Sequence, residues 1–336
     1  MEIFELLKQR IRGNKKRIVF PEGLDERVLR AAVALGEESL LTPVVLGDAE
    51  QIRKKTVQLQ LSDQAFQIID PMKFDLFDQM TQRLVSLRQG KTSLDQAKEM
   101  LHSGNYFGTM LVQMNLADGM VSGAAHSTAE TVRPALQLIR TKLGQKRVSG
   151  AFVMEKGTKR YVFADCAINL APTAEQLAEI AYQSARTAEM IGIHPKIALL
   201  SFSTKGSAKG EMVEKVQRAV ALIHERYPEL EADGELQFDA ATIPEVAAHK
   251  APDSDVAGHA NVFVFPELQS GNIGYKLVQR LGGFTAIGPI LQGLNAPVND
   301  LSRGASEQDV YHAGIFTAAQ AISQEGENNA NVNDHF

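Results

Sequence analysis

Apolar and polar residues alternate along this chain in blocks whose period switches between that of a strand and that of a helix. Short β-branched runs, such as residues 17–20, end at glycine, proline or small polar residues, as strands commonly do. Each run is followed by a segment with apolar residues three and four positions apart, as in residues 25–35, which is typical of an amphipathic helix. This alternation predicts an α/β fold with mainly parallel sheets, covered by helices on both faces.

The same pattern predicts where each element lies. Strands are expected at residues 17–20, 42–47, 66–70, 119–123, 148–154, 160–167, 196–202, 235–239, 261–265 and 285–291, with 148–154 and 160–167 forming a hairpin. Helices are expected at residues 2–12, 25–35, 49–58, 74–89, 93–102, 174–188, 209–225, 243–249, 272–281 and 307–323.

The chain of 336 residues is long for a single core, and a basic, glycine-containing turn at residues 144–147 divides it into two blocks. We predict a first α/β domain formed by residues 1–143 plus 298–336 and a second formed by residues 144–297. Residues 1–143 end without an obvious closing element, which the helix at 307–323 can supply by packing back onto them. The polar residues 325–336 are expected to form a frayed tail.

Composition excludes several classes of protein. The net charge of −5 and the pI near 5.9 argue against a nucleic-acid or membrane surface. Cys166 is the only cysteine, so no intramolecular disulfide forms and a reducing compartment is expected. The chain has neither a signal-peptide core at residues 1–20 nor a run of 18 apolar residues, so we expect a cytoplasmic protein. No G-x-G-x-x-G fingerprint follows a strand, and no H-E-x-x-H or Cys/His set indicates a metal.

Residues 297–309 combine a hydroxyl, a guanidinium, a glycine and several carboxylates just before the last predicted helix. Ser306 and Asp309 fit the capping pattern [ST]-x-x-[DE], so this helix should begin near residue 307. Ser302 and Arg303 would then lie in a loop aimed at the start of the helix. The pattern fits a capped helix with a loop salt bridge and also fits an anion site.

Residues 121–128 form a second strand-to-helix junction rich in small polar residues. Ser127 begins another capping pattern, which fits simple capping with a surface arginine. It also fits a phosphate cradle made of helix N–H groups, Ser127, Thr128 and Arg133. His126 is equally well explained as a structural histidine.

Two further junctions, at residues 201–208 and at residues 21–23 with Arg27, have the same character, although each also fits a plain turn. Loops at the carboxyl ends of parallel strands meet at one edge of a sheet, so we expect all four to converge. Asp165 and Asp239 end predicted strands, where aspartates serve more often as caps than as cation ligands. Cys166 lies in an apolar run and is expected to be a buried small hydrophobe.

The motifs at these junctions resemble, in order and from about residue 15 to about residue 323, those of the phosphate acetyl/butyryltransferase family. The motifs are Val19-Phe20-Pro21-Glu22-Gly23, Asp25-Glu26-Arg27, Ser122-Gly123 with His126-Ser127-Thr128, Arg133-Pro134, Phe202-Ser203-Thr204-Lys205-Gly206-Ser207, Asp233-Gly234-Glu235-Leu236-Gln237-Phe238-Asp239-Ala240, Phe265-Pro266, Gly271-Asn272-Ile273-Gly274-Tyr275-Lys276 and Asn299-Asp300-Leu301-Ser302-Arg303-Gly304. Any one of them is a weak signal, whereas the ordered series is specific.

The resemblance implies two Rossmann-like lobes with mainly parallel sheets, like those of isocitrate and isopropylmalate dehydrogenases, with the active site in the interlobe cleft. It implies an acyltransferase, usually a homodimer, that catalyses acetyl-CoA + phosphate ⇌ CoA + acetyl phosphate. Coenzyme A is then a substrate, and neither a metal nor a permanently bound cofactor is expected. Other acyl groups, as in phosphate butyryltransferases, remain an alternative. A non-catalytic acyl-CoA-binding module and a nicotinamide dehydrogenase are further alternatives that fit less well.

The resemblance also implies roles for particular residues. Asp309 would remove the thiol proton of coenzyme A, and Ser302 would hydrogen-bond the tetrahedral transition state. Arg303 and Arg133 would bind phosphate or acetyl groups, while Arg27 and Arg88 are candidates for coenzyme A or phosphate contacts. The family often has cysteine where this chain has Ala305, which argues against an essential thiol at that position.

Overall fold

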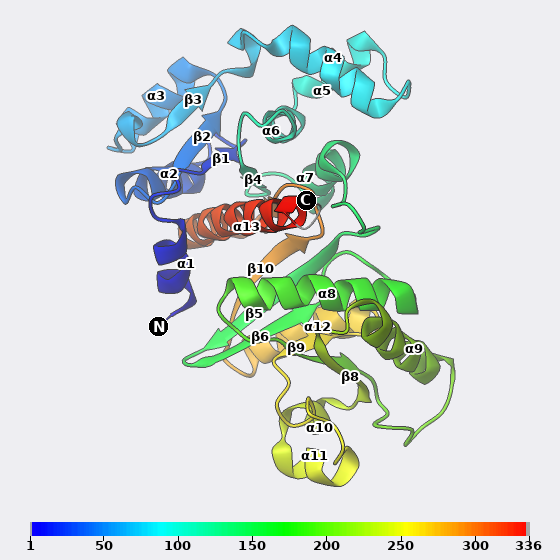
Figure 1. Ribbon diagram of the computed structural model, residues 1–336. Coiled ribbons are helices and arrows are strands. Elements are labelled where there is room, and N and C mark those ends of the chain that lie inside the picture. The colour runs from blue at the N-terminus through cyan, green and yellow to red at the C-terminus, as the bar shows by residue number, and fades with distance from the viewer. Residues whose placement is uncertain (1, 334–336) are drawn as a thin grey trace. The chain divides into compact units, whose positions relative to one another are not determined.

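The chain folds into two compact units, which a computed structural model describes for residues 2–333, with side chains through residue 326 (Figure 1). The terminal unit comprises Ile3–Leu143 together with the chain from Leu294 onward, and the central unit comprises Gly144–Gly293. We propose that these units are the two domains expected from the sequence.

The terminal unit contains a five-stranded sheet in which every pair of neighbouring strands is parallel. Its strand order is β11-β4-β1-β2-β3. The strands are β1 (Arg17–Phe20), β2 (Thr42–Leu46), β3 (Gln67–Ile69), β4 (Gly119–Ser122) and β11 (Val298–Asp300). Because all strands run the same way, the loops that follow β1, β4 and β11 leave the sheet at one edge.

Helices cover both faces of this sheet. They are α1 (Ile3–Ile11), α2 (Glu26–Glu37), α3 (Ala49–Gln58), α4 (Phe77–Arg88), α5 (Leu94–Leu101), α6 (Gly104–Gln113), α7 (Thr128–Pro134) and α13 (Glu307–Asn333). Val19 lies against Gly108 of α6, whereas Phe20, the next residue of β1, lies against Gly314 of α13. Successive strand residues point to opposite faces, so α6 and α13 pack on opposite sides of the sheet. The expected packing of the last helix onto this unit is confirmed.

The central unit contains a six-stranded mixed sheet of order β10-β5-β6-β9-β7-β8. Its strands are β5 (Ser149–Lys156), β6 (Lys159–Ala164), β7 (Lys196–Leu200), β8 (Glu231–Leu236), β9 (Val262–Val264) and β10 (Thr285–Gln292). Strands β5 and β6 form the predicted hairpin, β10 runs antiparallel to β5, and the remaining pairs are parallel. The expectation of mainly parallel α/β sheets is confirmed.

The helices of the central unit also lie on both faces of its sheet. They are α8 (Ala174–Met190), α9 (Glu211–Arg226), α10 (Phe238–Thr242), α11 (Pro244–Lys250) and α12 (Leu268–Arg280). Ser149 of β5 donates a hydrogen bond to Gln183 of α8, whereas Phe152 stacks on Tyr275 of α12 with ring centroids 3.9 Å apart. An odd and an even position of one strand therefore contact different helices, which places α8 and α12 on opposite faces.

The predicted strand at residues 235–239 is wrong in position. Strand β8 ends at Leu236, and residues 238–242 form the helix α10. The strand lies at the edge of the sheet and begins with polar residues that sequence patterning does not assign to a strand. Glu231, for example, bonds to His194 at 2.6 Å.

Helix α6 and strand β11 were also not predicted, and one predicted tail is helical. Helix α6 contains Gly104 and Gly108, which lower helix propensity, and most of its residues are buried. Strand β11 is buried although it contains Asn299 and Asp300, so it lacks an apolar run. Helix α13 continues to Asn333 where a frayed tail was expected, and residues 334–336 lie outside the described residues.

Helix α1 is joined to α13 by an aromatic contact close to the start of α13. The rings of Phe4 and His312 stack with centroids 3.4 Å apart, and Gln308 lies 2.7 Å from the His312 Nε2 atom. Burial, opposed by the negative charge of Asp309, lowers the pKa of His312 from 6.5 to about 4. The imidazole is therefore neutral in the folded chain at neutral pH.

This shift predicts a pH dependence of stability. Between pH 6.5 and about 4 the unfolded chain binds a proton at His312 that the folded chain does not bind, so the free energy of unfolding should fall as the pH is lowered. His312→Phe keeps the ring stack and should make this slope smaller, as measured by urea unfolding at several pH values. His249→Phe, at an exposed position on α11, is the control. Equal slopes in wild type and His312→Phe would contradict the prediction.

Candidate active site

Three loops of the terminal unit that carry predicted site residues follow neighbouring strands. Strand β4 lies between β1 and β11, so the loop after β4 has the β1 loop on one side and the β11 loop on the other. A side chain added at Gly123, which has a φ of +111°, would collide with Asp300 and Leu301. The β4 and β11 loops are therefore in direct backbone contact at the carboxyl edge of the sheet, where open α/β sheets bind ligands.

The N–H groups of the β4 loop are occupied by a carboxylate of the chain itself. Glu22, which is 7% exposed, accepts hydrogen bonds from four successive backbone N–H groups, those of Gly123 at 3.2 Å, Ala124 at 3.0 Å, Ala125 at 2.7 Å and His126 at 3.1 Å. The His126 ring adds a fifth contact, with Nδ1 2.8 Å from Glu22 Oε1. The loop N–H groups at residues 123–126, just before the helix N–H groups of the predicted cradle, thus hold a carboxylate of the chain.

The hydroxyl groups of Ser127 and Thr128 are also engaged within the chain. Ser127 donates from its N–H and its Oγ to Glu130 at 2.8 and 2.6 Å, and Thr128 donates from Oγ1 to Asp300 Oδ2 at 2.6 Å. These bonds from Ser127 lower the pKa of Glu130, as do its electrostatic interactions with His126 and Arg303. Glu130 therefore lies within electrostatic range of both the β4 loop and the β11 loop.

Asp300, at the end of β11, is a buried carboxyl that sequence patterning did not single out as a functional residue. It is 3% exposed, and its Oδ1 atom has no hydrogen-bond partner among the described residues. Burial raises its pKa, the hydrogen bond from Thr128 opposes that effect, and the negative charge of Glu22 adds to it. Glu22 and Asp300 thus place two carboxyl groups at one sheet edge. Glu22 follows the β-branched strand at residues 17–20, which could have indicated it, whereas Asp300 ends a strand without an apolar run and had no such signal.

Arg27 connects the three loops through all five of its side-chain N–H donors. Nε and Nη2 bond to Asp25, the N-cap of α2, at 3.0 and 2.7 Å. Nη1 donates to the backbone oxygens of Arg303 at 3.0 Å and Ala305 at 2.7 Å, and Nη2 also donates to the backbone oxygen of Ala124 at 2.7 Å. A guanidinium has five such donors, so every side-chain N–H group of Arg27 is hydrogen-bonded within the chain.

The β11 loop ends in the predicted capping box. Ser306 donates from its N–H and its Oγ to Asp309 Oδ2, both at 2.8 Å, and its Oγ accepts from the Asp309 N–H at 3.2 Å. All of these side-chain bonds of Asp309 use Oδ2, and no hydrogen bond among the described residues involves Oδ1. Ser302 and Arg303 precede this box and are exposed. The capping prediction is confirmed, and it leaves one carboxylate oxygen of Asp309 open.

The two remaining arginines differ in their placement. Arg133 is exposed on α7, about one and a half turns beyond Thr128. Arg88 ends α4, and its Nε atom is buried with no hydrogen-bond partner among the described residues. In the part of the chain that the structure describes, no hydrogen bond or ion pair connects Arg88 with the three loops.

Candidate positions of the central unit serve as structural caps. Glu235 accepts hydrogen bonds from Ser203 Oγ at 2.9 Å and the Gly206 N–H at 2.7 Å, so the loop at residues 201–208 also surrounds a carboxylate of the chain. Asp165 accepts from the N–H groups of residues 167–169. Burial raises the pKa of the Cys166 thiol well above its usual value. Within residues 2–333, no group of three His, Cys, Asp or Glu side chains is placed to hold a metal ion.

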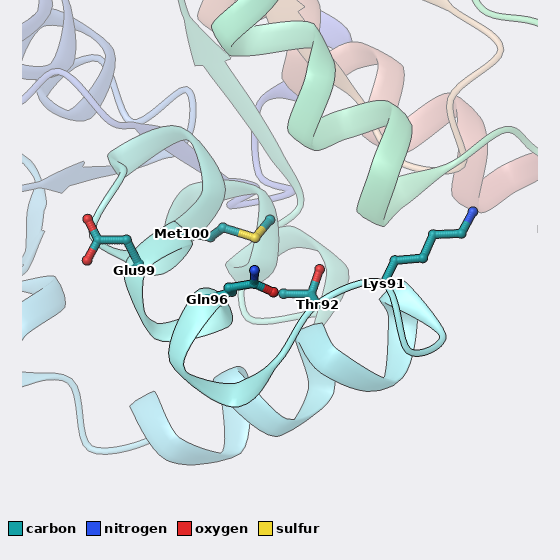
Figure 2. A pocket seen from close by; sticks show the side chains of 5 residues that line it. All are labelled: Lys91, Thr92, Gln96, Glu99 and Met100. Atoms are coloured by element: carbon teal, nitrogen blue, oxygen red, sulfur yellow. The ribbon is translucent and has the colours of Figure 1, made fainter.

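A pocket of about 380 Å³ lies elsewhere in the terminal unit, at the turn between α4 and α5 (Figure 2). Lys91, Thr92, Gln96, Glu99 and Met100 line it, and Figure 2 shows the Lys91 and Glu99 side chains pointing away from each other. None of the candidate site residues lines this pocket, and its charged groups do not converge.

Residues 2–318 match the sequence profile described as "Phosphate acetyl/butaryl transferase". The chain belongs to the phosphate acetyl/butyryltransferase family. The family assignment made from the ordered motifs is confirmed, and with it the expectation of an acyltransferase enzyme.

Members of this family resemble the chain over almost its full length. The phosphate acetyltransferase of Bacillus subtilis (strain 168) is 55% identical over 321 residues, which cover 96% of this chain and 99% of that protein. A phosphotransacetylase from Streptococcus pyogenes is 59% identical with a TM-score of 0.94, covering 95% of this chain and 98% of its own. The EutD phosphotransacetylase from Staphylococcus aureus is 54% identical with a TM-score of 0.91 and the same coverage.

In residues 2–333 no helix has both the length and the apolar character needed to cross a membrane.

Because Arg27 bonds to three loops, an arginine-to-lysine substitution should lower stability more at Arg27 than at Arg30, which lies on the same helix α2. Arg27→Lys keeps the charge but cannot supply five donors, so backbone oxygens in two loops lose their partners, and the free energy of unfolding should fall by about 1–3 kcal/mol. The guanidinium of Arg30 bonds, among the described residues, only to Glu26 on the surface, so Arg30→Lys should change the free energy of unfolding by less than about 0.5 kcal/mol. Urea unfolding followed by circular dichroism measures both. Equal effects at the two positions would contradict the bridge.

Proposed function

We propose that this protein is a phosphate acetyltransferase that catalyses acetyl-CoA + phosphate ⇌ CoA + acetyl phosphate. The observation that carries the proposal is the segment from Ser302 to Asp309 at the edge of a parallel sheet. This segment supplies a hydroxyl, a guanidinium and a carboxylate with one unbonded oxygen among the described residues. Arg27 bonds both to this segment and to the β4 loop. Relatives that share 54–59% of their residues with nearly the whole chain are named as phosphate acetyltransferases or phosphotransacetylases, which supports the same reaction.

Asp309 is proposed as the base for the thiol of coenzyme A. A thiol with a reference pKa of about 8.5 is only a few per cent thiolate at neutral pH, so its attack on acetyl phosphate needs an acceptor for the proton. Ser306 holds Oδ2 of Asp309 through two hydrogen bonds, which orients the carboxylate and leaves Oδ1 for the thiol. General base catalysis of this kind typically contributes roughly 10²–10⁴-fold. Capping and catalysis then use different oxygens of one side chain.

Ser302 and Arg303 are proposed to stabilise the charge that develops on the carbonyl oxygen and on the phosphate group, and Arg133 to bind the same group. Acetyl phosphate is an activated acyl donor, so the protein needs to orient the substrates and stabilise charge without forming a covalent intermediate. Ser127 and Thr128 already donate to Glu130 and Asp300, so we propose that they shape this site.

The two remaining arginines of the proposed site have different roles. All five donors of Arg27 are used inside the chain, so it acts on substrates through the loops that it holds. The Nε atom of Arg88 is without a hydrogen-bond partner among the described residues, so Arg88 remains a candidate for a direct contact with coenzyme A or phosphate.

We further propose a cytoplasmic homodimer that has coenzyme A as a substrate and no permanently bound cofactor or metal. Helix α12 supports a second copy as partner, because Ile273, Leu277 and Leu281 lie four residues apart on one face and are 53%, 52% and 83% exposed. An exposed apolar stripe of this kind is typical of an interface.

The proposed function is tested by comparing acyl donors. Purified protein with phosphate should release coenzyme A from acetyl-CoA faster than from propionyl-CoA and butyryl-CoA, as followed with a thiol reagent, and should not do so when phosphate is omitted. One or two methylenes in a pocket change transition-state binding by only about 1–3 kcal/mol, so the ratio of kcat/KM values decides the acyl group. A preference for butyryl-CoA would support the alternative, and no phosphate-dependent release would refute both.

The roles of Asp309 and Ser302 predict loss of turnover without loss of the fold. Asp309→Asn keeps a capping oxygen but not a base, and Ser302→Ala removes a donor to the transition state, so each should lower kcat by roughly 10²-fold or more. The control is Asp48→Asn, at the N-cap of α3, where the side chain accepts from the Gln51 N–H and only stability should respond. Turnover close to wild type in either site variant would remove that residue from the mechanism.

A further inference from the structure

His126 is held by a buried carboxylate through one ring nitrogen and has the other nitrogen available. Nδ1 lies 2.8 Å from Glu22 Oε1, and the backbone N–H of His126 bonds to the same oxygen at 3.1 Å. The Glu22 side chain is 3% exposed, whereas that of His126 is 35% exposed. No hydrogen bond among the described residues involves Nε2. A carboxylate acceptor fixes the proton of the neutral imidazole on Nδ1, which leaves a lone pair on Nε2.

The position of His126 places it beside the proposed reaction centre. Its loop lies between the β1 and β11 loops, and the Arg27 guanidinium binds the backbone of Ala124 and of Arg303. Glu130 interacts electrostatically with both His126 and Arg303, so one carboxylate lies within range of the β4 loop and of the β11 loop. Among the described residues, Arg27 of α2 and Asp300 interact electrostatically with Glu22, Glu130 of α7 interacts with His126, and Arg303 interacts with Glu130.

We propose that His126 is a second acid–base group of the transfer reaction and handles the proton of phosphate through Nε2. This inference rests on the proposed function. When phosphate attacks acetyl-CoA, the hydroxyl of monohydrogen phosphate donates its proton to Nε2 while the new bond forms between a phosphate oxygen and the carbonyl carbon. The carbon–sulfur bond then breaks, its electron pair stays on sulfur, and the thiolate takes the proton that Asp309 carries. Solvent returns the proton from His126 to Asp309.

The reverse reaction uses the same atom as a donor. Acetyl phosphate carries no proton at neutral pH, so the imidazolium hydrogen-bonds its phosphoryl oxygen through Nε2–H and gives that proton to the departing phosphate. The buried Glu22 carboxylate stabilises the imidazolium, as carboxylates do beside catalytic histidines. Glu22 itself touches no substrate and is a positioning residue, because it holds the ring and the four N–H groups of the loop.

The test compares His126→Gln with His194→Gln. His194 is a matched control, since its Nε2 lies 2.6 Å from Glu231 in the central unit, far along the chain from the proposed chemistry. We expect His126→Gln to lower kcat by roughly 10²–10⁴-fold, with the KM for coenzyme A unchanged. In wild type, kcat/KM for acetyl phosphate should fall as the pH rises, and this fall should disappear in His126→Gln. His194→Gln should keep both the rate and the pH profile.

Added imidazole should restore part of the activity of His126→Ala, which a purely structural histidine does not allow. The proposal is overturned if His126→Gln keeps the wild-type kcat and pH profile. A measurement on the wild-type enzyme covers variants that fail to fold: with ¹⁵N-labelled histidine, saturating inorganic phosphate must shift an Nε2 resonance, and no shift would overturn the proposal. Wild type without phosphate-dependent release of coenzyme A would instead refute the proposed function, so the two failures are distinguishable.

Discussion

The carboxylate of Glu22, enclosed by the β4 loop, is the interaction on which the rest of this site depends. A buried carboxylate is costly unless its lone pairs are satisfied, and a buried run of N–H groups is costly unless each finds an acceptor. Four consecutive N–H groups and one imidazole meet both requirements at once. Because Gly123 lies directly against Asp300 and Leu301, this single contact also sets the distance between the β4 and β11 loops.

A similar arrangement occurs in the central unit, where Asp165 accepts from the N–H groups of its own loop and Glu235 of β8 accepts from the Gly206 N–H in the loop after β7. Loops rich in glycine and serine after a strand therefore do not by themselves indicate an external anion. In this chain an internal carboxylate fills several of them and gives the loop a fixed shape. What is left for a substrate is the outer side of such a loop, formed by groups such as the His126 ring and the Arg303 side chain.

Local patterns predicted those parts of the structure that depend on neighbours in sequence. The strand at residues 17–20, the helix at residues 49–58 and the Ser306–Asp309 capping box appear where the alternation and the capping residues placed them. Strand β11 was not predicted because Asn299 is buried through side-chain hydrogen bonds to Thr317 and Gln320, which lie 18 and 21 positions later in the chain. Burial by distant polar partners leaves no apolar signal.

The candidate site, like the fold, could be predicted from the sequence only in part. Which residues gather at the sheet edge followed from strand ends, but the partner of each followed only from the fold. Glu22 binds N–H groups 101 to 104 positions away, and Arg27 reaches a backbone oxygen 276 positions away. The proposed roles of Asp309 and Ser302 came from family resemblance, because a capping carboxylate and a catalytic one have the same local pattern. The available oxygen of Asp309 becomes visible only when its hydrogen bonds are known.

The order of the strands has a consequence for how the chain is made. Both the strands and the helices of the central unit lie in one continuous stretch, Gly144–Gly293, whereas the terminal unit needs β11, which follows that stretch. During synthesis the central unit is therefore complete while β4 still has an open edge, and domains generally fold as units as they emerge. The last strand, the loop that Arg27 binds and helix α13 arrive together. Assembly of the site is thus the closing step of folding, and a ribosome that stops before residue 298 releases a chain with one finished unit and an unpaired strand edge.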